Sequence, residues 1–258
     1  MRKYFSSILI ITSLLYGGVS YADFGGMDSG GGQGYVCFDS AEVAASVRKN
    51  QGNIEDRYIN NITSLESLDL FEARMKRGSL TPILYENILN EDLQTYLANN
   101  ISRIGKYLPS FANRIIQSQQ SFREENIIWA QIGLVPVNDS HVVASYDTSL
   151  CTLTTLAIQF KEEALDFLNI DPRLFYHSKM TVQSQAILLL HEYIYLVARN
   201  QGKTSSRSTR LAISYLIRDD KKLSVLEVAQ NLFKLGMLSQ SEFNEVMAST
   251  PVNLMWGE

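Results

Sequence analysis

Apolar residues recur at helical spacing in the first and last parts of the chain, and a stretch of strand-like composition separates these two parts. Spacings of three and four residues between apolar positions are typical of helices that bury one face. They predict helices over residues 63–78, 83–105, 110–123, 182–200, 205–218, 225–235 and 241–248. Asp171-Pro172 predicts a further, brief helix after the strand-like stretch.

Three pairs of residues match the capping box, in which Ser or Thr precedes Glu by three positions. The pairs are Thr63 with Glu66, Ser224 with Glu227, and Ser239 with Glu242. Each pair predicts the first residue of a helix, because the two side chains can bond to backbone N–H groups that lack helical partners.

The middle of the chain is rich in Ile, Val, Thr and aromatic residues, with turn-forming residues between them. Strands are expected, together with one near the N-terminus, over residues 35–38, 127–131, 141–146, 152–160 and 165–168. Helices, a small sheet and further helices predict an α+β fold that is predominantly helical, with a small mixed or antiparallel sheet in the middle of the chain. We expect Trp129 and Trp256 to be packing anchors.

The N-terminal pattern predicts export. Residues 1–22 have a basic start, an apolar stretch at 5–16 and small residues before Asp23, which together are typical of a secretory signal peptide. Residues 23–34 are dense in glycine and predict a flexible leader. The rest, residues 35–258, is expected to form a single α+β domain.

Charge and cysteine content narrow the class of protein. Removing Arg2 and Lys3 with the signal leaves 21 basic residues against 27 acidic ones, a formal charge of −6. That balance argues against a nucleic-acid partner, which requires a basic surface. Cys37 and Cys151 are the two cysteines, and in an exported protein such a pair predicts a disulfide bond. No apolar stretch after the signal is long enough to span a membrane, so we expect a soluble protein in the periplasm, at the outer-membrane surface or outside the cell.

The helix expected at 182–200 carries the candidate site. Its segment 186–190 is apolar all round, which indicates a buried helix, and His191 and Glu192 follow it directly. Tyr195 lies one turn after His191 and shares its face. A buried carboxylate without a partner costs several kcal/mol, so these side chains need neutralisation, hydrogen bonds or a ligand.

A metal site is one interpretation. Zinc peptidases use H-E-x-x-H, in which two histidines bind zinc and the glutamate activates water. Here the segment is H-E-Y-I-Y, so the zinc ligands would be His191, the uncommon ligand Tyr195 and a third residue such as His141 or His177. Glu192 would then serve as the catalytic base of a divergent zincin-like hydrolase.

A satisfied core pair is the second interpretation. One of the nearby arginines, Arg199, Arg207 or Arg210, could clamp Glu192 with two hydrogen bonds, while His191 donates to a backbone carbonyl. A polar ligand pocket lined by the same residues is a third. The core pair is the interpretation that we favour, because an unpaired buried carboxylate is so costly.

The chain also resembles a family of uncharacterised exported bacterial proteins. The resemblance rests on a glycine-rich start, a V-C-x-D strand, a second cysteine before the sheet, L-x-L-H-E-x-x-Y, and G-x-T-x-S-x-x-x-R. The matching residues here are Gly30 to Gly32, Val36, Cys37, Asp39, Cys151, Leu188, Leu190, His191, Glu192, Tyr195, Gly202, Thr204, Ser206 and Arg210. The resemblance implies export and fold rather than an activity, and it implies that His191, Glu192, Tyr195, Ser206 and Arg210 form one cluster.

A basic stretch follows the candidate helix. Residues 199–222 contain seven basic and two acidic residues, so an anionic partner could bind there. Taken together, the sequence predicts an envelope-associated binding or structural protein without a cofactor, and the metal-dependent hydrolase is the alternative.

Overall fold

The structure is a computed structural model, and its described residues are 31–75, 92–131, 133–134, 149–162, 164–218, 223–251 and 254–256. The predicted signal peptide, the strand expected at 141–146 and the candidate ligand His141 lie outside these residues. Within them the fold is α+β, as the sequence predicts.

Most helices agree with the apolar periodicity, but those at Ala41–Lys49 and Asp56–Ile59 are not predicted. The helices are α1 (Ala41–Lys49), α2 (Asp56–Ile59), α3 (Leu68–Met75), α4 (Leu93–Tyr107), α5 (Pro109–Ser121), α6 (Pro172–Phe175), α7 (Val182–Arg199), α8 (Arg207–Leu216), α9 (Val225–Lys234) and α10 (Gln240–Ser249). Both predicted capping boxes at the start of α9 and α10 are confirmed, with Ser224 and Ser239 as the N-caps.

The strands form two three-stranded sheets rather than one. They are β1 (Gln33–Phe38), β2 (Ile62–Ser67), β3 (Ile127–Trp129), β4 (Cys151–Thr155), β5 (Ala157–Glu162) and β6 (Leu165–Ile170). The first sheet has the order β2-β1-β4 and is antiparallel, whereas the second has the order β3-β6-β5, with β3 parallel to β6. In the first sheet Cys37 lies opposite Cys151, and the predicted disulfide between them is confirmed.

The prediction that Thr63 and Glu66 start a helix is wrong. Thr63 and Glu66 belong to β2, and the helix begins only at Leu68. The segment pairs along its whole length with β1, and the Thr63 hydroxyl donates to the carbonyl of Cys37 instead of capping a helix. Tertiary pairing with a strand nearly thirty residues away has overridden the local pattern.

The single strand expected at 152–160 is also wrong, because the chain breaks at Leu156. The N–H groups of Leu156 and Ala157 both donate to the carbonyl of Gly32, at 2.9 and 3.1 Å, and this turns the chain from the first sheet into the second. Ile158 and Phe160 share a face as expected, but the opposite face of β5, with Ala157 and Gln159, is the buried one.

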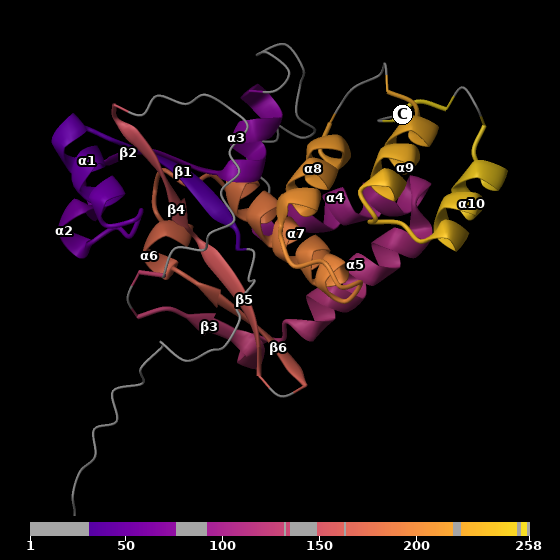
Figure 1. The fold of residues 1–258 in the computed structure, drawn as a ribbon, viewed down its shortest axis with the longest axis horizontal. Coiled ribbons are helices and arrows are strands. Elements are labelled where there is room, and N and C mark those ends of the chain that lie inside the picture. Colours follow the sequence, from indigo (N-terminus) through magenta and orange to yellow (C-terminus); the bar gives the residue numbers. More distant parts are fainter. Residues whose placement is uncertain are drawn as a thin grey trace, which may run out of the picture.

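Helix α7 lies in the middle of the molecule (Figure 1). The two sheets with α1, α2 and α6 lie on one side of it in this view, and α4, α5, α9 and α10 lie on the other. It packs against β2, β5, α3, α4, α5 and α8, so its whole circumference is covered. One core cluster of buried apolar side chains extends from Val36 in β1 to Trp256.

The described end of the glycine-rich leader is ordered. Residues 31–34 are buried, and Gln33 and Gly34 already pair with β4, so the predicted leader overlaps the first strand. Within the described residues, no helix combines the length and the apolar character that crossing a membrane requires.

Candidate functional site

Helix α7 buries both members of the histidine–glutamate pair. Thr181 caps the helix, its hydroxyl accepting the N–H of Ser184 at 3.1 Å, and every residue from Ala186 to Ala198 is buried. His191 and Glu192 are 0% exposed. The side chains therefore lie in the core and do not reach the surface.

Glu192 is held by two donors, one from the residue before β1 and one from β5. The N–H of Gly32 donates to Oε1 at 2.7 Å, and Nε2 of Gln159 donates to Oε2 at 2.7 Å. Nε2 of Gln159 also donates to the backbone carbonyl of Glu192. Both carboxyl oxygens thus accept hydrogen bonds, which is the pattern that suits the ionised form. Burial raises the pKa of Glu192, and His191, Gln159 and the Gly32 N–H offset this effect only in part.

His191 is paired with a carboxylate from α3. Its Nδ1 lies 3.0 Å from Oδ1 of Asp69, and both side chains are buried. Burial by itself lowers the pKa of His191, but Asp69 and the adjacent Glu192 together leave it raised above its ordinary value. Burial also raises the pKa of the neighbouring Tyr193, to about 12. We call Gly32, Asp69, Gln159, His191 and Glu192 the buried polar cluster.

The partners of the pair are not those that the sequence predicts. We expected an arginine on Glu192 and a backbone carbonyl on His191, and the structure places Gly32 with Gln159 on the first and Asp69 on the second. Arg199 acts on Glu192 only indirectly, because its Nη1 donates to Oε1 of Gln159 at 3.2 Å. Gln159 thereby links a surface guanidinium to the buried carboxylate.

The remaining predicted site residues are also buried. Tyr195 is buried, with its ring centroid 6.2 Å from that of His191, and its hydroxyl donates to the carbonyl of Thr204 at 3.4 Å. Arg210 is buried on α8 and donates to Oε1 of Gln33 at 3.5 Å. Ser206 is buried at the N-cap position of α8, although its side chain makes no capping hydrogen bond.

Glycine is required at position 32. A Cβ at this position would lie 2.2 Å from Cδ1 of Leu188 and 2.6 Å from Oε1 of Glu192. The backbone just before β1 can approach α7 closely enough to bond to Glu192 because position 32 has no side chain. Gly32 therefore has a packing role in addition to its place in the predicted leader.

Sequence reasoning missed Gly32, Asp69 and Gln159 as members of the cluster. A signal existed for Asp69, because it shares a helix face with Glu72 while both are surrounded by Leu70 and Ala73, which marks a buried carboxylate. Gln159 occupies an inward position of a strand, two residues after the small Ala157, but this position identifies no partner for it.

The structure describes no metal centre in the candidate helix. Among the described residues, no group of three or more His, Cys, Asp or Glu side chains is arranged to hold a metal ion. His177, a candidate third ligand, accepts the N–H of Lys179 with its Nδ1 in the loop before α7. Nε2 of His191 is buried and has no hydrogen-bond partner among the described residues.

The basic stretch at 199–222 does not form one continuous charged surface in its described part. Arg210 is buried, and Nη1 of Arg199 lies 3.8 Å from a carboxylate oxygen of Asp166. Arg207 is exposed and Lys203 is half-buried, and residues 219–222 lie outside the described residues.

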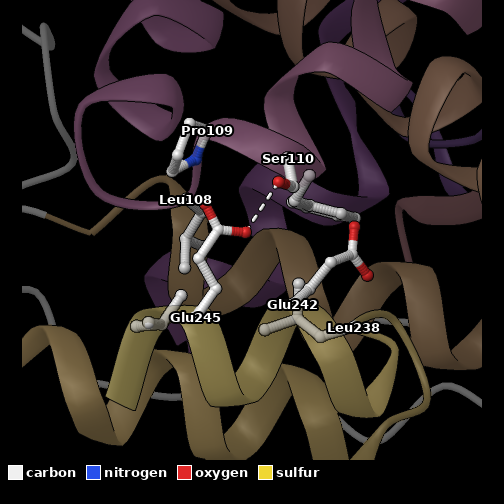
Figure 2. Close-up of a pocket in the computed structure, with 8 residues that line it drawn as sticks. Leu108, Pro109, Ser110, Leu238, Glu242 and Glu245 are labelled. Atoms are coloured by element: carbon white, nitrogen blue, oxygen red, sulfur yellow. Dashed lines mark hydrogen bonds between the residues drawn. The ribbon is translucent and has the colours of Figure 1, made fainter. Parts of the chain in front are cut away.

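A shallow hollow lies elsewhere, between the start of α5 and α10 (Figure 2). It encloses about 170 Å³ including open solvent, which is less than the roughly 300–1,000 Å³ of most ligand sites. Ser110 at its rim donates to Oε2 of Glu245 at 2.9 Å. None of its lining residues belongs to the buried polar cluster.

No family model, no curated protein and no solved structure matches this chain.

Proposed function

We propose that this chain is a non-catalytic protein exported to the cell envelope, with a binding or structural role. The histidine–glutamate helix is, in this proposal, an internal brace that fixes the first strand and the second sheet to the central helix. The residues that resemble an active-site motif hold the fold together.

The observation that carries the proposal is the complete burial of His191 and Glu192 together with their bonds to protein groups. Glu192 bonds to Gly32, the residue before β1, and to β5 through Gln159, and His191 bonds to α3 through Asp69. Three elements far apart in the sequence thus meet at two consecutive residues. A catalytic base would need substrate or water at its carboxylate, where Gly32 and Gln159 already donate.

Two features support export. The pattern at residues 1–22 is that of a signal peptide. The disulfide between Cys37 and Cys151 is the kind of bond that persists in oxidising compartments. N-terminal sequencing of the protein from a periplasmic fraction should give Asp23 as the first residue, and an intact Met1 in that fraction would contradict export by cleavage.

One observation favours the metal-dependent hydrolase as a second candidate. A carboxylate on one ring nitrogen of a histidine, with the other nitrogen available, is the arrangement behind many metal-bound histidines. Asp69 on Nδ1 of His191 has this arrangement. The hydrolase requires ligands beyond those that the described residues bring together.

Metal analysis separates the two candidates. The purified chain, dialysed against zinc-containing and then zinc-free buffer, should retain no stoichiometric zinc by mass spectrometry. His191→Ala is the test variant, and His177→Ala is the control, because His177 lies in a loop outside the cluster. One zinc per chain that is lost in His191→Ala and kept in His177→Ala would overturn the brace.

A further inference from the structure

The short strand β3 is an open edge of the second sheet. It pairs with β6 on one side, and within the described ranges no strand lies on its other side. The N–H of Ala130 donates to Ile170 in β6 at 2.8 Å. Alternate residues of a strand direct their backbone groups to opposite edges, so the N–H and C=O of Trp129 face the open edge. The backbone groups of Ile127 face the same edge by the same alternation. Its C=O is open there, whereas its N–H donates to the carbonyl of Glu124.

Large apolar side chains flank this edge. Trp129 is 42% exposed, Ile128 39% and Tyr176, in the turn after α6, 62%. The rings of Trp129 and Tyr176 lie 5.2 Å apart between centroids and are tilted by 37°. Trp129, a predicted packing anchor, does pack against Phe175 and Tyr176 but remains part of the surface, whereas Trp256 is fully buried.

The β3 strand is short and contains no charged residue and no proline. Natural sheets protect their edges with very short edge strands, charged side chains, proline or bulges, because an open edge pairs readily with other chains. The three residues of β3 are Ile, Ile and Trp. The edge thus combines open backbone groups with exposed side chains that would favour an incoming strand.

The size of the surface indicates what fits on it. From their exposed fractions, Trp129 and Tyr176 on one face of the strand and Ile128 on the opposite face present roughly 300 Å² of surface in total. A stable dimer buries roughly 800 Å² on each partner, so the surface is too small for a second copy of the chain. It matches one extended segment, whose backbone would bond to Trp129 and whose alternate side chains would pack on the rings.

We propose that the β3 edge binds an extended peptide segment of a partner protein by β-strand addition. The peptide carries an apolar or aromatic side chain that packs against Trp129 and Tyr176. This inference rests on the proposed binding role and identifies the class of partner.

Short peptides that bind the purified chain are selected from a random library displayed on phage. The selected peptides are then synthesised and titrated into the purified chain. Tryptophan emission reports on binding, because Trp256, the other of the two tryptophans, is buried. We expect the emission to shift to shorter wavelength. Trp129→Ala should weaken binding about tenfold or more, as removal of a tryptophan hot spot does. Met247→Ala on α10, where Met247 is 49% exposed, is the matched control and should leave binding within about twofold.

Two further measurements test the strand geometry. A winning peptide N-methylated at the residues that face β3 should lose binding, and the amide of Trp129 should exchange with deuterium rapidly in the free protein and slowly in the complex. Each of four results would overturn the proposal: no peptide whose binding needs Trp129, binding that survives N-methylation, a Trp129 amide already protected in the free protein, or a dimer that dissociates in Trp129→Ala. Zinc on His191 would overturn the proposed function and leave the peptide titration unchanged.

Discussion

Replacing Glu192 with glutamine tests whether the buried polar cluster is a brace. The change keeps the shape of the side chain but turns one of its two acceptors into a donor. Oε1 can still accept from Gly32, while the new amide NH₂ meets Nε2 of Gln159, which is itself a donor. Gln159 cannot rotate its amide to compensate without losing the bonds to Arg199 and to the backbone carbonyl of Glu192.

The expected loss follows from these contacts. A buried donor left without an acceptor costs about 1–3 kcal/mol, and a hydrogen bond to a charged group contributes about 1.5–3 kcal/mol. Relief of the buried charge offsets part of this loss. We expect Glu192→Gln to lower the free energy of unfolding by about 2–3 kcal/mol, which corresponds to a fall in Tm of roughly 4–12 °C for a chain of this size.

Thermal and urea unfolding, followed by circular dichroism, measure the effect. Glu245→Gln is the matched control, because Glu245 is an exposed glutamate on α10, and it should change stability by no more than about 0.5 kcal/mol. In a Gln159→Met background, Glu192→Gln should cost at least about 1 kcal/mol less, because the clash between donors is gone. A Glu192→Gln chain that is as stable as the wild type, or more stable, would refute the reasoning and indicate a strained functional site.

Three more results are expected from unfolding experiments. Gly32→Ala should lower the free energy of unfolding by about 2–3 kcal/mol through overpacking. The control is Gly105→Ala in α4, where the new Cβ would meet nothing closer than 3.4 Å, and it should be neutral or stabilising. Equal losses of stability in the two variants would contradict the close approach of the backbone at Gly32 to α7. Raising the pH from about 5 to about 9 should destabilise the wild type more than Glu192→Gln, as parallel urea titrations can show. The Glu192 carboxyl and the His191 imidazole have raised pKa values, so they stabilise the fold below their ordinary pKa values and lose this effect as the pH rises through the raised pKa values. Equal dependence of stability on pH in the two proteins would count against this reasoning. Replacing Cys37 and Cys151 with serine should cost up to about 4–5 kcal/mol, because the disulfide spans 114 residues, and an unchanged urea midpoint would be inconsistent with this role.

The sequence predicts best those features that depend on local chemistry. The apolar circumference of α7, the capping boxes of α9 and α10 and the brief α6 after Asp171-Pro172 all appear as expected. Each is decided by residues within one or two turns. The disulfide follows from the cysteine count together with the signal-peptide pattern, without knowledge of the fold.

What the sequence does not predict depends on distant partners. Thr63 and Glu66 match a helix start, but β1 lies alongside and makes a strand more favourable. The helix that carries the candidate pair is buried as predicted, whereas the partners Asp69 and Gln159 come from segments that no local pattern connects to α7. An arginine is the common partner of a buried carboxylate, so proximity along the chain favours Arg199, Arg207 or Arg210 over a glutamine on a strand.

The contact between Gly32 and Glu192 joins residues 160 positions apart. The residue that leads into the first strand therefore acquires this hydrogen-bonding partner only after three quarters of the polypeptide has been made. Until then, the first strand can pair with β2, which follows it closely in the sequence, but it has no bond to the central helix. The attachment of the N-terminal segment to the core is thus a late event in the synthesis of the chain.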